Sequence, residues 1–182
     1  MKNYLLPILL LFVGFNNYSQ QTKRYKELTK NLKFIDSVKT IKKFKNGKVK
    51  KVFTLCTYEF DDYEYAYYCS DNLIYKRNGS LVVKEKIDGF GSMLSYDALD
   101  KKGRLHMSIR TTEIDNISTN TKEFLTKEKN FKIKVIQKNY YACDNDSLIL
   151  YQEGKKMNGK KFGVWKTYNC CGSIFKEKNH SK

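Results

Sequence analysis

The sequence predicts a mostly β protein, folded as an antiparallel β-hairpin meander in one domain. Three observations predict this class: short runs with alternating apolar and polar side chains, glycine-containing turns between the runs, and many β-branched and aromatic residues within them. Alternation with period two gives a strand one apolar face, and glycine adopts turn conformations that other residues avoid. Runs that follow one another with short turns between them favour neighbouring antiparallel strands.

The first 19 residues have the three-part layout of a secretory signal peptide. Lys2 supplies a positive charge, residues 4–15 form an apolar run, and residues 16–19 are polar, with cleavage expected after Ser19. The apolar run is shorter than the roughly 20 residues that a membrane-spanning helix needs, although an uncleaved N-terminal anchor is the alternative. We therefore expect an exported protein, periplasmic, on the cell surface or secreted, with no transmembrane span in the mature chain.

A lead-in segment, residues 20–36, precedes the expected β domain at 37–182. Tyr25, Leu28 and Leu32 recur every three or four positions, so a short N-terminal amphipathic helix and an irregular segment both fit. About 160 residues follow the signal, which is the length of one domain.

Glycine turns divide residues 37–182 into hairpins. Asn46-Gly47 and Asn78-Gly79 each separate two alternating runs, which predicts two-residue turns with both residues at positive φ. Lys102-Gly103 marks a third turn. The expected strands lie at 38–44, 49–56, 72–76, 81–83, 93–96, 105–109, 131–136 and 148–151.

One segment differs from this pattern. Residues 120–128 begin with Asn120, a good capping residue, and place Glu123 in the first turn and Lys127 in a later one. This charge order is typical of a short helix. We expect the helix to cross from one part of the sheet to another.

Residues 58–68 are dense in aromatic and acidic side chains. Tyr63, Tyr65 and Tyr67 alternate with other residues, so they would share one face of a twisted strand, with their rings packed and their hydroxyls in water. A ligand or partner surface is the alternative for this segment.

Basic residues dominate the chain, which has a formal net charge of +16. Such a balance favours anionic partners. Only four basic residues are arginine, and arginine is the side chain best suited to bidentate phosphate and base contacts. We therefore expect a solvated lysine surface and no nucleic-acid partner. The runs Lys42-Lys43 and Lys48-Lys50-Lys51 are the candidates for contact with anionic headgroups.

Five cysteines define the redox expectations, and outside the cytosol such thiols can form disulfides. The favoured pairs are Cys56 with Cys69, and Cys143 with Cys170 or Cys171, but an odd count leaves at least one thiol unpaired within the chain. A zinc site is the weaker alternative, because the chain has no CxxC motif. No metal or other cofactor is expected.

The sequence holds no established catalytic motif: HExxH, GxSxG and a phosphate-binding glycine loop are all missing. A Cys–His hydrolase would have to use His106 or His180. Acid–base chemistry would need paired carboxylates, such as Asp61-Asp62 or Asp144 with Asp146. No catalytic residue is assigned, and a hydrolase is kept as an alternative.

Near the C-terminus, glycines and aromatics form a recognisable pattern over about residues 158–176. Gly159, Gly163, Trp165, Tyr168 and Gly172 make up the series Gly, three residues, Gly-x-Trp-x-x-Tyr, three residues, Gly. This pattern resembles the bacterial variant of the MORN (membrane occupation and recognition nexus) repeat, in which each unit is a β-hairpin. A fainter unit lies near 89–109.

What the resemblance implies is modest. Bacterial proteins of this type are often antitoxin-like or serve as surface and interaction modules, and eukaryotic relatives are linked to membranes and phosphoinositides. The five matching residues would have structural roles, with the Trp165 ring buried. We therefore expect an exported, non-catalytic binding module built of MORN-like hairpins, whose partner is a protein or an anionic envelope surface. An antitoxin or immunity-like protein is the alternative.

Overall fold

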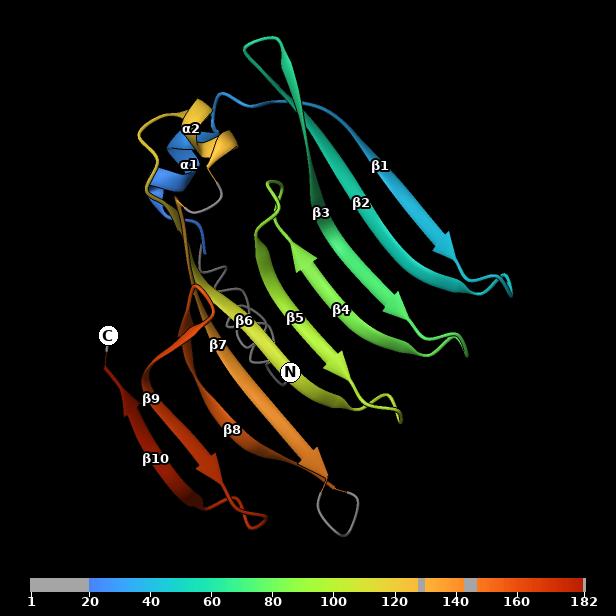
Figure 1. The fold of residues 1–182 in the computed structure, drawn as a ribbon, viewed down its shortest axis with the longest axis vertical. Helices are drawn as coiled ribbons and strands as arrows, with labels where there is room; N and C mark the ends of the chain where they lie inside the picture. The colour runs from blue at the N-terminus through green and yellow to red at the C-terminus, as the bar shows by residue number, and fades with distance from the viewer. Residues whose placement is uncertain (1–19, 128–129, 143–146, 182) are drawn as a thin grey trace, which may run out of the picture.

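The computed structural model describes residues 20–127, 130–142 and 147–181, and confirms the antiparallel meander. Ten strands form one sheet in which spatial order follows sequence order (Figure 1). The strands are β1 (Lys33–Lys43), β2 (Val49–Phe60), β3 (Tyr63–Tyr75), β4 (Leu81–Ile87), β5 (Met93–Leu99), β6 (Leu105–Asn116), β7 (Phe131–Ala142), β8 (Leu148–Met157), β9 (Lys160–Tyr168) and β10 (Ile174–His180). The predicted signal peptide, 1–19, lies outside the described residues.

Two short helices accompany the sheet, α1 (Lys23–Thr29) and α2 (Thr121–Thr126). The side chain of Thr22 caps α1 and that of Asn120 caps α2, each by accepting a backbone N–H of the first turn. The expectation that the second helix crosses the sheet is wrong, because α2 joins β6 to β7 and these strands are direct neighbours.

A three-residue turn recurs along the described meander, and in four places it is closed by the same two backbone hydrogen bonds. In the first copy the N–H of Phe44 donates to the carbonyl of Lys48, and the N–H of Gly47 donates to that of Phe44. Only the glycine, at φ +81°, is left-handed. The expected two-residue turn at Asn46-Gly47 is therefore wrong, as it is at Asn78-Gly79. These two hydrogen bonds close the turns at 44–48, 76–80, 100–104 and 169–173, whereas the turn at 88–92 has only the first of them, from the N–H of Asp88 to the carbonyl of Ser92.

Turns in which both residues have positive φ occur at other positions. Asp61 and Asp62, with φ of 50° and 60°, join β2 to β3, and Asn158-Gly159, with φ of 47° and 78°, joins β8 to β9. This finding places the acidic pair Asp61-Asp62 in a hairpin tip.

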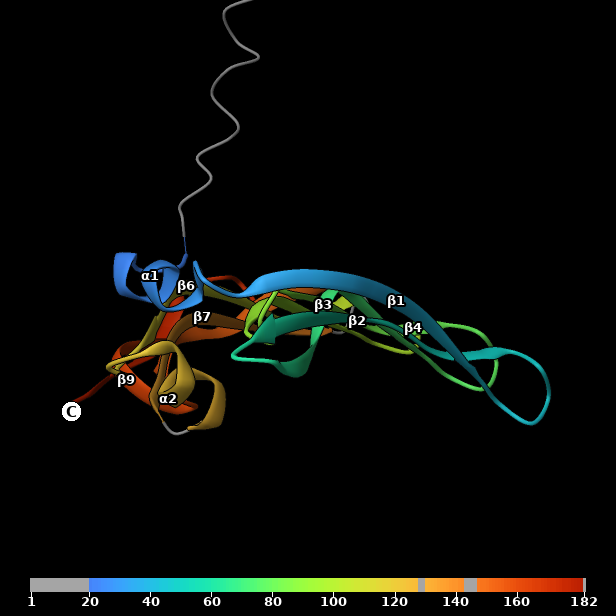
Figure 2. The same ribbon diagram turned by 90° about the horizontal axis from the view of Figure 1, so that it is seen from above.

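The sheet is a single curved layer whose helices gather at one end (Figure 2). The core lies beneath them. Tyr25 is fully buried and makes edge-on ring contacts with Phe90, Phe124 and Phe131, while Ile114 of β6 closes the cluster. Because the helices cover only this end, most side chains of the outermost strands, β1 and β10, are exposed.

The lead-in segment is fastened to this core. Ile114 exchanges backbone hydrogen bonds with Gln20 and Thr22, so the segment runs along the irregular part of β6 before α1 begins. Strand β1 starts at Lys33, inside the segment that the sequence assigned to the lead-in. An irregularity between Phe34 and Asp36 interrupts the alternation there, which hides the start of the strand.

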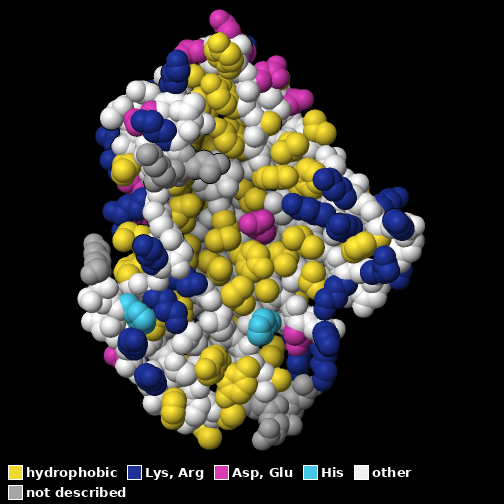
Figure 3. Space-filling view, viewed as in Figure 1, with side chains coloured by type: hydrophobic (Ala, Val, Ile, Leu, Met, Phe, Trp, Pro, Cys, Tyr) yellow, Lys and Arg dark blue, Asp and Glu magenta, His cyan; other side chains and the backbone are white. Residues whose placement is uncertain are grey.

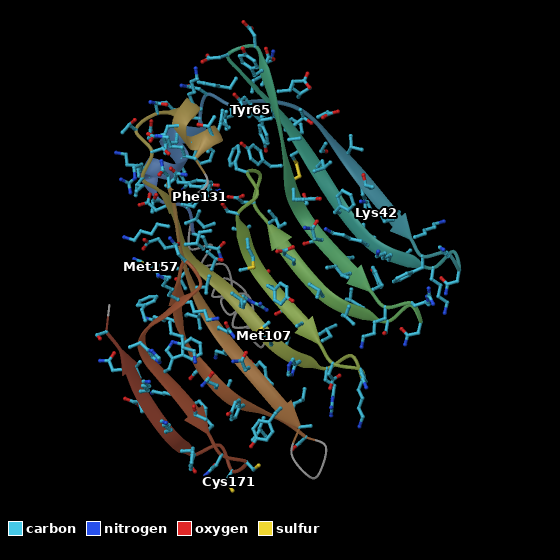
Figure 4. All side chains as sticks on the ribbon, in the orientation of Figure 1. Lys42, Tyr65, Met107, Phe131, Met157 and Cys171 are labelled. Carbon is cyan, nitrogen blue, oxygen red and sulfur yellow. A yellow bond between two sulfur atoms is a disulfide. The ribbon has the colours of Figure 1, made fainter. Side chains whose placement is uncertain are left out.

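A disulfide joins Cys56 of β2 to Cys69 of β3 at the edge of the core (Figure 4). Both cysteines are buried, and they belong to the same apolar cluster as Tyr58. The bond therefore ties the first hairpins to the region that the helices cover.

Candidate functional site

Basic side chains collect at the tips of three neighbouring hairpins, which lie at the same end of the sheet. The turns at 44–48, 76–80 and 100–104 carry seven lysines and arginines, with Asp100 as their one carboxylate. Asp100 is already paired with Arg104. Figure 3 shows Lys and Arg gathered on this side, whereas Asp and Glu gather where the β2–β3 hairpin ends. We call residues 42–51 together with these turns the basic tips.

Aromatic rings support several lysines of the basic tips. The ammonium of Lys51 lies 5.1 Å from the ring centroid of Phe53 and 4.8 Å from that of Tyr68, and Lys42 lies 5.4 Å from Phe53. Lys50 lies 5.9 Å from the Phe44 ring. Cation–π contacts of this kind hold lysine side chains without neutralising their charge.

Hydrogen bonds tie the first two tips to each other. Lys48 donates from Nζ to the carbonyl of Asn78, 2.9 Å away, and the Asn46 amide donates to the carbonyl of Arg77. The β1–β2 and β3–β4 turns therefore present their charges as one surface. Lys42, labelled in Figure 4, lies where β1 approaches its turn.

The C-terminal motif packs as a hairpin unit. Trp165 of β9 is 3% exposed, and its indole lies on the backbone of Gly154 in β8, where a Cβ would be 2.3 Å from the ring. The indole N–H donates to the carbonyl of Lys155. Gly159 lies in the β8–β9 turn and Gly172 in the β9–β10 turn.

Gly163 and Tyr168 complete the motif. Gly163 has φ +62° within β9, opposite the last residue of β10. The Tyr168 hydroxyl donates to Glu153 Oε1 at 2.7 Å. This hydrogen bond lowers the pKa of Glu153, with Lys138 as a second cause, and it raises the pKa of Tyr168.

We expect Tyr168→Phe to raise the pKa of Glu153 towards its ordinary value, measured by NMR titration of the side-chain carboxyl carbon. A lowered folded pKa adds stability that is present above the unfolded value and lost as pH falls through the folded value. The wild type should therefore lose more stability than the variant on acidification below about pH 4.5. Lys138→Gln, as a comparison, should shift the pKa in the same direction but less. An unchanged pKa in Tyr168→Phe would show that the hydroxyl bond is not its main cause.

The C-terminal cysteines Cys170 and Cys171 lie at the far end of the sheet from the helices. Both are exposed thiols in the β9–β10 turn, where Figure 4 labels Cys171. The Sγ of Cys170 is 2.8 Å from the Tyr141 hydroxyl. The predicted partner Cys143 lies outside the described residues. Among the described residues, no group of three or more His, Cys, Asp and Glu side chains is arranged to hold a metal ion.

The hydrolase candidates are not brought together. His106 is exposed on β6, whereas Cys170 and Cys171 follow β9, so β7 and β8 lie between them in the sheet. His180 ends β10 and meets Trp165 edge-on, with their ring centroids 6.5 Å apart. Asp61 and Asp62 form a turn, and Asp144 and Asp146 lie outside the described residues.

An apolar groove runs down the sheet from α2. One hollow of about 410 Å³ lies between Phe124 of α2 and the sheet, and it adjoins a second of about 510 Å³. Both are lined by Met93, Phe131 and Ile133. Their described lining side chains are mainly apolar and include no carboxylate, imidazole or thiol, and Lys156 is the one charged side chain among them.

Sequence reasoning missed a third hollow, of about 350 Å³, beside Trp165. Lys176, Lys178 and His180 of β10 line it, and their spacing of two was the available signal, because alternate residues of a strand share a face. The hairpin expected at 158–176 included a returning strand at Ile174-Phe175, but that strand was not extended to Lys178 and His180.

Comparisons with known proteins gave no match: no family model, curated protein or solved structure is significantly similar to the chain. In the part of the chain that the structure describes, neither helix has the length and apolar character that a membrane span requires.

Proposed function

We propose that this chain is an exported, non-catalytic binding module that attaches through its basic tips to an anionic envelope surface. The observation that carries the proposal is the concentration of seven basic residues against one carboxylate in three adjacent turns. Within the described chain, Lys43, Lys45 and Lys48 form no ion pair with a carboxylate. Their charges are thus available to a partner, and an anionic lipid surface attracts each nearby lysine by about 1 kcal/mol.

The shape of the sheet supports attachment with the basic tips facing the anionic surface. Three tips at one end can approach a flat surface together, and the first two are linked through Lys48 and Asn46. The acidic β2–β3 tip lies at the opposite end, so the two ends of the sheet carry opposite charge (Figure 3).

Flotation of the full chain with phosphatidylglycerol-containing vesicles tests the proposal. We expect binding at low salt, loss of binding at high salt, and none to pure phosphatidylcholine. Replacing Lys43, Lys45 and Lys48 with Gln should lower the partition coefficient about a hundredfold, since three lysines contribute about 1 kcal/mol each.

The matched control removes three exposed lysines near the helices: Lys23, Lys26 and Lys122 are replaced with Gln. Both variants lose the same charge and keep residues 1–19, so the difference between them isolates the basic tips. Equal losses in the two variants, salt-insensitive binding, or no binding at all would contradict the proposal.

A protein partner is the second candidate, favoured by the edge strand β1. Among the strands that the structure describes, β1 pairs only with β2, and its Phe34, Val38 and Ile41 are about half exposed. An open apolar edge can accept a strand from another protein, as an immunity-type interaction would require. Co-purification that Val38→Lys abolishes, with the basic-tip variant unaffected, would favour this candidate over the first.

A further inference from the structure

We propose that the hollow beside Trp165 is a binding site for a small ring compound that carries a phosphate group, such as a sugar phosphate. The hollow is formed by one face of β8, β9 and β10, at the opposite edge of the sheet from β1. It is separate from the basic tips, so neither proposal depends on the other.

Positive charge converges on this hollow. Lys161, Lys176 and Lys178 line it together with His180, and no carboxylate is among its described lining residues. None of the three lysines forms an ion pair with a carboxylate of the described chain. Lys134, by contrast, does not line the hollow and pairs with Glu113. Several unpaired ammonium groups around one space favour a doubly charged anion over a singly charged one.

The register explains why the acidic residue of β10 is not part of the site. Lys178 is opposite Trp165 and Lys176 is opposite Thr167, so both lie on the face of the indole. Glu177, between them, is opposite Lys166 and points to the other face. The alternation of side chains along β10 therefore places Lys176 and Lys178 on the face of the hollow and Glu177 on the opposite face.

The remaining lining residues suit a ring with hydroxyl groups. Trp165 forms the floor, with the Lys161 ammonium 4.0 Å from its ring centroid, and the Tyr151 and Phe175 rings at the sides are exposed. Gln152 and Thr167, which hydrogen-bond to each other, add polar groups that can orient a ligand. Aromatic walls with a few convergent polar groups are typical of small-molecule sites.

Fluorescence titration of the full chain tests the site, because Trp165 is the single tryptophan. The probes are glucose 6-phosphate, inorganic phosphate and glucose, at constant ionic strength. We expect a saturable change in emission with glucose 6-phosphate, weaker binding of phosphate, and no response to glucose. Lys176→Gln/Lys178→Gln should weaken binding of the sugar phosphate by at least about tenfold, because each lysine supplies a charged hydrogen bond.

The matched control is Lys43→Gln/Lys45→Gln, which removes the same charge from the basic tips and should bind the sugar phosphate as the wild type does. Lys176 and Lys178 are exposed, so their replacement should leave the fold intact, as circular dichroism would verify. No saturable change, equal affinity for phosphate and sugar phosphate, or equal weakening by both double variants would overturn the proposal.

Discussion

Replacing Trp165 with alanine is expected to lower the free energy of unfolding by about 3–5 kcal/mol, the range for removing a buried aromatic side chain. The ring is 3% exposed, and its N–H donates to the carbonyl of Lys155, 2.9 Å away. Its removal leaves a space over Gly154 that the single-layered sheet has no second layer to fill. Urea unfolding followed by circular dichroism measures the change, since the variant has no tryptophan.

A control and a double-mutant cycle sharpen this prediction. Phe175→Ala, at a ring that is 75% exposed, should change stability little. Gly154→Ala should also destabilise the protein, because the new Cβ would lie 2.3 Å from the indole, but much less so once Trp165 is already alanine. Additive effects of the two changes, or a Trp165→Ala loss as small as that of Phe175→Ala, would contradict the packing described for β8 and β9.

The sequence was sufficient for the architecture because the information is local. Alternation and glycine turns follow the chain, and in a meander each strand pairs with its neighbours in sequence, so no long-range pairing had to be inferred. The helix at 120–128 was also found, because Asn120, Glu123 and Lys127 form a local capping and charge pattern.

Details that depend on tertiary packing were less accessible. The Asn46-Gly47 pair is compatible with a two-residue turn and with a three-residue turn. The hydrogen bond from the N–H of Phe44 to the carbonyl of Lys48 shows that the turn has three residues. That α2 joins adjacent strands could not be deduced, since a helix between two strands is equally compatible with a crossover. Gly154 carried no signal of its own, because its role appears only when Trp165 lies on it.

The two candidate sites also differ in whether a local sequence pattern indicates them. The lysine runs of the basic tips are consecutive or nearly so, and the sequence therefore indicated them. The hollow beside Trp165 combines residues from three strands, Gln152, Lys161 and Lys178 among them, whose meeting depends on register. Irregular pairing between β8 and β9 near Gly154 sets this register, and no local pattern reveals it.

Tyr25 is expected to contribute more than any other side chain to the stability of the end of the sheet that the helices cover. Tyr25→Ala should lower the free energy of unfolding by about 3–5 kcal/mol, because the ring, which belongs to α1, is fully buried against α2 and the sheet. Thermal and urea unfolding of the variant would measure the loss. Hydrogen exchange should show that α1 and the adjoining part of β6 lose protection first, since their contacts pass through this ring.

The hydroxyl of Tyr25 can be separated from its ring by Tyr25→Phe. The hydroxyl donates to Asp88 Oδ2 at 2.8 Å, and burial, with Asp88 as a further cause, raises the pKa of Tyr25 above its usual range. Asp88 keeps the side-chain amide of Gln21 and the backbone N–H groups of Phe90 and Ser92 as donors, so the loss should be about 1–3 kcal/mol. The ring therefore accounts for the larger share. A Tyr25→Phe variant as unstable as Tyr25→Ala would instead place the main contribution in the hydrogen bond to Asp88, and would shift the centre of this end of the fold from the aromatic cluster to the turn at 88–92.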